Sequence, residues 1–112
     1  MKFLVLCRLK KNGDGPRKAL RLKHLEYIQM HKASILASGP ALDEANAPSM
    51  MILFVQFTDK QAVEDFIQHE PYTASGQVIE SVEVHRWAQV LPEPVPGSLG
   101  REIEKERTST PA

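Results

Sequence analysis

The stretch Met-Met-Ile-Leu-Phe-Val-Gln-Phe at residues 50–57 decides the fold. In a β-strand successive side chains point to opposite faces, so the odd-numbered and even-numbered residues of this stretch form two separate faces. Both faces are apolar, whereas a strand with one side in water alternates apolar with polar residues. The run Phe-Leu-Val-Leu-Cys at residues 3–7 has the same character. We therefore expect two such strands side by side in the middle of a small sheet.

The rest of the chain is too short to cover both faces of that sheet. Its 112 residues fit one domain with a modest core. Only two segments have the pattern of a good helix, and two helices can cover one face. The other face must then meet a second copy of the chain or another partner, and we expect a homodimer formed through this open sheet face.

Composition and charge exclude several classes of function. Lys plus Arg and Asp plus Glu balance at 14 each, which argues against a nucleic-acid partner. No apolar run approaches the roughly 20 residues of a membrane span, and no leader precedes the first strand, so a cytoplasmic protein without a membrane partner is expected. The single cysteine, Cys7, lies inside a predicted strand. A buried thiol without a cationic neighbour is a poor nucleophile, so Cys7 is interpreted as structural.

The first half of the chain has the pattern of strand, helix and strand. A strand is expected at 2–8, and a loop with glycines at 10–16. A helix is expected from about 17 to 34, where Gly and Pro are absent. Its predicted buried arc consists of Leu22, Leu25, Ile28 and Leu36. A short strand at 35–40 and a polar, mobile flap at 41–49 lead into the central strand.

A second helix should follow the central strand. Thr58 with Gln61 three residues later matches a capping box, which marks a helix start. Pro71 ends this helix, because the residue before a proline avoids the helical conformation. The predicted buried stripe consists of Ala62, Val63, Phe66 and Ile67. A turn at 72–76 and a strand of mixed polarity at 78–90, suited to a sheet edge, complete the pattern.

The composition changes after the last strand. Prolines at 92, 94 and 96 precede a charged run at 101–107 that has no apolar stripe. We therefore expect a domain at 1–90 and a C-terminal tail at 91–112, first extended and then a short surface helix, mobile unless a partner subunit holds it.

The order of elements is β-α-β-β-α-β. With helices on one side of a four-stranded antiparallel sheet, this order predicts an α+β fold of the ferredoxin-like type, in which the first and third strands are central. Two such sheets packed through their open faces would enclose a barrel-like core.

A His and a carboxylate are the candidate catalytic pair. Arg21 and His24 lie about one helical turn apart, near Ile28 at the margin of the apolar arc. Glu70 ends the second helix, which should run beside the first. A His held by a carboxylate is a typical general base, and Arg21 would bind an anionic group. The alternative is that His24 and Arg21 are boundary residues with local hydrogen bonds only.

Other sites have weaker support. His31, His69 and His85 share no metal-ligand spacing with one another or with Cys7, so no metal site is expected. No nucleophile elbow and no Ser/His/Asp set can be identified, and no cofactor site is expected.

Several short motifs resemble those of the YciI-like (YCII-related) proteins over residues 1–90. These motifs are Arg21-x-x-His24-Leu25, Ala37-Ser38-Gly39-Pro40, the strand ending at Phe57, and Glu70-Pro71-Tyr72 with Gly76. The resemblance implies a dimeric α+β barrel, a fold shared with muconolactone isomerases and small cofactor-free monooxygenases. It also implies an active site built from a His and an Asp.

Carried over to this sequence, the His is His24 and the Asp position holds Glu70. Glu keeps the charge but is one methylene longer, so its reach to His24 is open. Tyr72, Ser38 and Gly39 would line the same pocket, between the sheet and the flap.

Two functional hypotheses follow. The first is a small cofactor-independent enzyme that transfers a proton, in an isomerisation or elimination, on a small anionic or aromatic-derived molecule. The second is a non-catalytic dimer that binds a small ligand or assists another enzyme. Fold alone does not assign a substrate.

Overall fold

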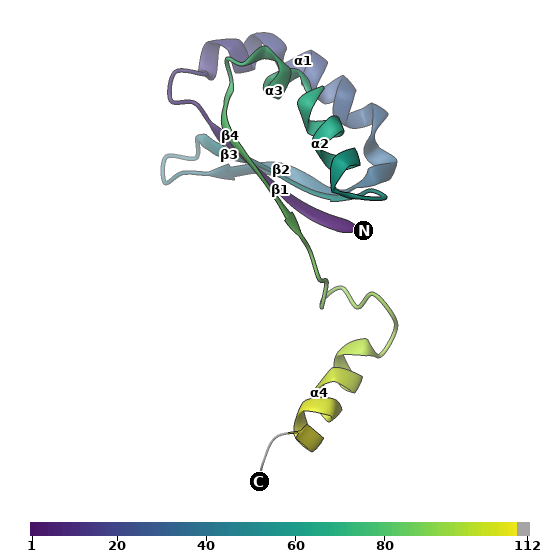
Figure 1. The fold of residues 1–112 in the computed structure, drawn as a ribbon. Coiled ribbons are helices and arrows are strands. Elements are labelled where there is room, and N and C mark those ends of the chain that lie inside the picture. Colours follow the sequence, from purple (N-terminus) through teal and green to yellow (C-terminus); the bar gives the residue numbers. More distant parts are fainter. Residues whose placement is uncertain (110–112) are drawn as a thin grey trace.

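The computed structural model describes residues 1–109, which form a four-stranded antiparallel sheet with helices packed on one face (Figure 1). Residues 110–112, the end of the predicted tail, lie outside the described residues. The elements in chain order are β1 (Lys2–Leu9), α1 (Asp14–Met30), a 3-10 turn (Lys32–Ser34), β2 (Ile35–Leu42), β3 (Pro48–Gln56), α2 (Lys60–Gln68), α3 (Pro71–Ser75), β4 (Ile79–Arg86) and α4 (Ser98–Ser109). The sheet order β2-β3-β1-β4 confirms the ferredoxin-like prediction, with β1 and β3 in the centre.

The two central strands bury one face under the helices. They pair antiparallel, with Val5 opposite Leu53. The side chains that alternate toward the helices are buried, and they are Phe3, Val5, Cys7, Met51, Leu53 and Val55. The side chains that alternate toward the other face are only partly buried, and they include Leu4, Leu6, Ile52 and Phe54. The helices of one chain therefore cover one face of the sheet, as the length of the chain predicted.

The predicted buried arc of the first helix is confirmed for Ile28 and wrong for Leu22, Leu25 and Leu36. Leu22 is 70% exposed and Leu25 46% exposed, and Leu36 lies in β2 with its side chain exposed. Helix α1 begins at Asp14 and ends at Met30, and its residues that pack on the core are Leu20, Tyr27 and Ile28. The prediction placed the leucines inward because of their hydrophobicity. The inward face also carries Arg17 and His24, which line a cavity.

The start of the second helix lies one residue later than the capping box indicated. Asp59, not Thr58, is the N-cap of α2, and its carboxylate accepts a hydrogen bond from the Ala62 amide at 2.9 Å. Gln61 instead donates to Asp65 at 3.1 Å. The predicted inward residues of α2 are buried except Ala62, which is partly buried; the buried ones are Val63, Phe66 and Ile67.

Three connections also differ from prediction. Most of the expected flap at 41–49 belongs to the β2–β3 hairpin, whose turn is held by the Asp43 side chain accepting from the amides of Ala45 and Ala47. The expected turn at 72–76 is the short helix α3, because Pro71 starts a helix as well as ending one. Strand β4 ends at Arg86 rather than at residue 90.

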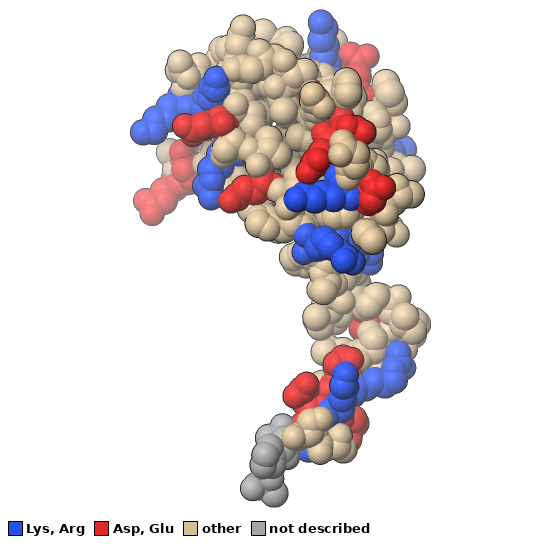
Figure 2. Space-filling view, in the orientation of Figure 1, with Lys and Arg blue, Asp and Glu red and all other residues tan. Residues whose placement is uncertain are grey.

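The C-terminal helix α4 lies away from the sheet and its helices (Figure 1). The predicted short surface helix is thus present, and its residues up to Ser109 are mostly exposed. Figure 2 shows acidic and basic side chains close to one another both on the visible face of the sheet domain and on α4. Among the described residues, no helix combines the length and apolar character that crossing a membrane requires.

Cys7 is buried in β1, and this burial has a measurable consequence. Burial, and secondarily the negative charge of Glu70, raise the pKa of the Cys7 thiol from 9.0 to about 12. The unfolded thiol therefore loses its proton first as the pH rises. Its contribution to stability is complete below pH 9 and is lost between pH 9 and 12.

We expect the free energy of unfolding to fall by about 2 kcal/mol from this thiol alone between about pH 9 and about pH 10.5. Urea denaturation at several pH values measures it, with Cys7→Ala as the control that lacks the ionisable group. The difference in stability between the two proteins should shrink over this interval. A difference independent of pH would contradict the expected shift.

Candidate active site

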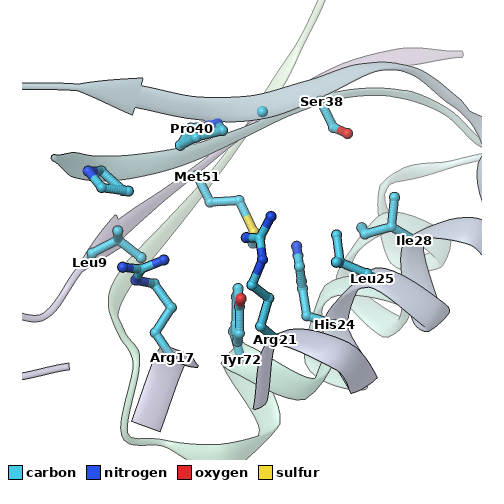
Figure 3. Close-up of a pocket in the computed structure, with 12 residues that line it drawn as sticks. Leu9, Arg17, Arg21, His24, Leu25, Ile28, Ser38, Pro40, Met51 and Tyr72 are labelled. Atoms are coloured by element: carbon cyan, nitrogen blue, oxygen red, sulfur yellow. The ribbon is translucent and has the colours of Figure 1, made fainter. Parts of the chain in front are cut away.

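A cavity of about 220 Å³ lies between α1, the β2 and β3 strands, and α3 (Figure 3). Its walls consist of Leu9, Arg17, Arg21, His24, Leu25, Ile28, Ser38, Gly39, Pro40, Pro48, Met51 and Tyr72. Five residues predicted for the site line this cavity, namely Arg21, His24, Ser38, Gly39 and Tyr72. The sixth, Glu70, does not line the cavity, and its carboxylate contacts the Nδ1 atom of His24. The lining is otherwise mostly aliphatic.

His24 and Glu70 form the expected pair. The Nδ1 atom of His24 lies 2.5 Å from the Oε1 atom of Glu70. The Glu70 side chain is fully buried and the His24 side chain is 12% exposed. Nδ1–H donates when Glu70 is an ionised carboxylate, which can only accept, and in the neutral ring this tautomer has its lone pair on Nε2. The Nε2 atom is therefore the nitrogen left for a molecule in the cavity.

The N-terminus of α3 fixes the carboxylate of Glu70. As the N-cap, Glu70 accepts hydrogen bonds from the amides of Tyr72 and Thr73, each at 3.2 Å, and from the Thr73 hydroxyl at 3.4 Å. A carboxylate is stabilised at this position because the amides there have no partner within the helix. The extra methylene of Glu relative to Asp does not prevent contact with His24. The sequence signal that was missed is Glu followed by Pro at the first helical position.

Tyr72 holds the plane of the imidazole. The rings of His24 and Tyr72 are stacked, with centroids 4.0 Å apart and planes 8° from parallel. Because Glu70 fixes one edge of the His24 ring and Tyr72 covers one face, the ring has little freedom to rotate. The imidazole is therefore held in one orientation before any ligand enters.

Besides His24 and Ser38, two arginines and a phenol supply polar groups to the cavity. Burial raises the pKa of Tyr72, the positive charges of Arg21 and Arg17 oppose the rise, and Glu70 adds to it. Arg21 has the larger effect of the two arginines on the pKa of the Tyr72 hydroxyl. The geometry between Arg21 and this hydroxyl does not meet the criteria for a hydrogen bond. Sequence reasoning missed Arg17, although it lies one helical turn before Arg21 and so shares its face of α1.

Fold and site together define a small ferredoxin-like α+β protein with a His–carboxylate pair beside an apolar cavity. Residues 1–88 match the YCII-related domain, and the chain belongs to that family. The predicted resemblance is thereby confirmed. A search of curated proteins gave no match.

Solved structures share the fold. One is 5-chloro-2-hydroxyhydroquinone dehydrochlorinase (TftG) from Burkholderia phenoliruptrix, in complex with 2,5-dihydroxybenzoquinone. It is 23% identical, with a TM-score of 0.72, and the match covers 80% of this chain and 95% of that one. Another is a candidate antibiotic biosynthesis monooxygenase from Bacteroides thetaiotaomicron, 12% identical with a TM-score of 0.52, covering 82% of this chain and 90% of that one.

Proposed function

We propose that this protein is a small enzyme that transfers a proton on a small anionic, aromatic-derived molecule without a cofactor. His24 is the acid/base, Glu70 orients it, and Arg21 binds the anionic group. The observation that carries this proposal is the contact of 2.5 Å between His24 Nδ1 and a fully buried Glu70, which leaves Nε2 at the wall of a cavity. A His held in this way matches the requirements of a general base.

The chemistry of the proposed step follows from these groups. Nε2 takes a proton from a carbon or hydroxyl of the substrate, and the electron pair stays on the substrate as an enolate or phenolate. Glu70 stabilises the imidazolium that forms, and the Arg21 guanidinium stabilises the oxyanion. Return of the proton to a different atom gives isomerisation. In elimination the freed electron pair forms a new double bond, the leaving group departs with the electron pair of its own bond to carbon, and the imidazolium gives its proton to the leaving group or to water.

The size and lining of the cavity favour a single ring. A volume of about 220 Å³ is below the ~300–1,000 Å³ of pockets for larger ligands. Ser38 and Gly39 from β2 and aliphatic side chains from α1 form opposite walls. The similar structure of TftG holds 2,5-dihydroxybenzoquinone, a molecule of this size and type.

A screen for proton exchange tests the proposal before the substrate is identified. Hydroxylated and chlorinated benzenes and their quinones, including 2,5-dihydroxybenzoquinone, are incubated with the protein in D₂O and followed by proton NMR. We expect faster exchange of a ring hydrogen, or formation of a new product, for at least one compound. Binding of ring compounds without any exchange or turnover would instead support the non-catalytic alternative.

We also propose that two copies pair through the open sheet face. This face carries Leu4, Leu6, Ile52 and Phe54 on the central strands, and Trp87 packs its ring edge-on against Phe54 with centroids 5.1 Å apart. A contiguous apolar sheet face of this kind is typical of a surface that binds another protein. Every residue of the cavity lies within 1–90, so we propose that this segment is the functional domain and that the tail at 91–112 is separate from it.

Phe54→Glu is expected to convert the dimer into a monomer, because it places a charge in the middle of the proposed interface. Sedimentation velocity at micromolar concentration measures the mass of both proteins. Lys60→Glu, an exposed change on α2 at the opposite face, is the control and should remain a dimer. A wild-type protein that is monomeric at these concentrations would contradict the pairing.

A further inference from the structure

Arg17 lies in the cavity with part of its hydrogen-bonding capacity unused. Its side chain is only 15% exposed, and its ion pair is with Asp14, 3.7 Å away and 76% exposed. Within residues 1–109, the buried Arg17 Nε and Tyr72 hydroxyl have no hydrogen-bond partner. Buried polar groups are normally satisfied, so these two atoms are available to hydrogen-bond water or a polar group of a ligand.

The charges around the cavity are unbalanced. Two guanidinium groups line it, and its lining contains no carboxylate. The buried carboxylate of Glu70 lies behind His24 and is already engaged by four donors, the His24 ring among them. A ligand that carries two negative charges would therefore fit the cavity better than a ligand with one.

The polar groups come from two helices, with Arg17, Arg21 and His24 on α1 and Tyr72 on α3. Figure 3 shows the Tyr72 hydroxyl between the side chains of Arg17 and Arg21, with Leu9 beside Arg17, and the His24 ring stacks directly on the Tyr72 ring. Both arginines line the same cavity as this phenol, and the positive charge of Arg21, followed by that of Arg17, opposes the rise in the pKa of Tyr72. A ring-sized molecule can thus present one oxygen to Arg21 and His24 and another to Arg17 and Tyr72.

We infer that Arg17 and the Tyr72 hydroxyl form a second oxyanion subsite, so that the ligand is a single ring with two anionic oxygens. The location of the first oxygen rests on the proposed function. In this arrangement Arg17 selects the doubly charged ring over a singly charged one. The guanidinium fork and the phenol donate to the second oxygen, and this oxygen holds the ring in a fixed position relative to His24 Nε2.

Two matched probes test the second subsite. The first is 2,5-dihydroxybenzoquinone, which carries two enolate oxygens at pH 8. The second is its monomethyl ether, which keeps the ring and carries one enolate oxygen. Absorbance titrations give both dissociation constants for the full-length protein. We expect the wild type to bind the doubly charged probe about 10- to 100-fold more tightly than the ether.

Variants assign that preference to Arg17. Arg17→Gln should lower the affinity for the doubly charged probe by about 10- to 100-fold and that for the ether by less than about threefold. Arg17→Lys, which keeps the charge, should retain part of the preference, and circular dichroism reports whether each variant is folded. Lys18→Gln, an exposed cation on the same helix that does not line the cavity, should behave as the wild type.

Several outcomes overturn the inference. These are equal losses for both probes in Arg17→Gln, no loss for either, and a wild type that binds neither probe or binds both equally. His24→Gln separates this test from that of the proposed function. If His24→Gln keeps the preference while no compound is turned over by the wild type, the subsite stands and the catalytic proposal fails.

Discussion

Replacing His24 with glutamine is expected to lower the turnover number by about 10²–10⁴-fold, for a substrate identified by the exchange screen. Glutamine has a similar size and its amide can donate to Glu70, so the buried carboxylate keeps a partner. It has no basic nitrogen to take the substrate proton. Steady-state kinetics measures the loss, and thermal unfolding checks that the variant is folded.

His69→Gln is the matched control for this prediction. His69 is exposed at the end of α2, where its Nδ1 lies 2.8 Å from the carbonyl of Asp65, and it does not line the cavity. Its replacement should leave turnover within a factor of about two. A His24→Gln protein that retained the wild-type rate would remove His24 from the chemistry and favour the ligand-binding alternative.

Replacing Glu70 with alanine is expected to lower the free energy of unfolding by about 2–4 kcal/mol. The variant loses the N-cap of α3 and leaves the amides of Tyr72 and Thr73 without their acceptor. It also leaves a cavity beneath His24, because the Glu70 side chain is fully buried. Urea denaturation followed by circular dichroism measures the change. A loss below about 0.5 kcal/mol would contradict the structural role of this carboxylate.

Glu70→Asp separates the structural role of this residue from its role beside His24. Asp is a favoured N-cap residue, so the loss of stability should stay below about 1 kcal/mol. The shorter side chain withdraws the carboxylate by about one carbon–carbon bond, ~1.5 Å, from His24 Nδ1. We therefore expect turnover to fall by about tenfold or more while α3 stays capped. Full activity in Glu70→Asp would show that the contact with His24 is not required.

The fold was largely predictable because its determinants are local in the sequence. The apolar run at 50–57 and the run at 3–7 predicted the central strands, which are β3 and β1. Helix α1 was predicted less well, since hydrophobicity alone placed Leu22 inward and placed Leu25 in the core, whereas Leu25 lines the cavity and stays half exposed. Its contact face instead includes Arg17, and a charged residue at an inward position signals a cavity only after the opposite wall is known.

The sequence named most of the polar residues that line the cavity, but it did not determine how they lie relative to one another. His24 and Glu70 lie 46 positions apart in sequence, and nothing local fixes their separation. Because Glu is one methylene longer than Asp, the sequence did not determine whether the Glu70 carboxylate contacts His24. The structure decides it because Glu70 caps α3, and this cap aims the carboxylate at His24.

The amino-acid order by itself determined the sheet, its central strands and the shortage of chain to cover both faces, since alternation and length follow from residues near one another. Only the tertiary structure decided that Arg17, Arg21, His24 and Tyr72 share one cavity and that Glu70 contacts the imidazole. The physical reason is that these contacts depend on how α1 is rotated and on where α3 begins. Both are set by packing between distant segments rather than by local sequence preference.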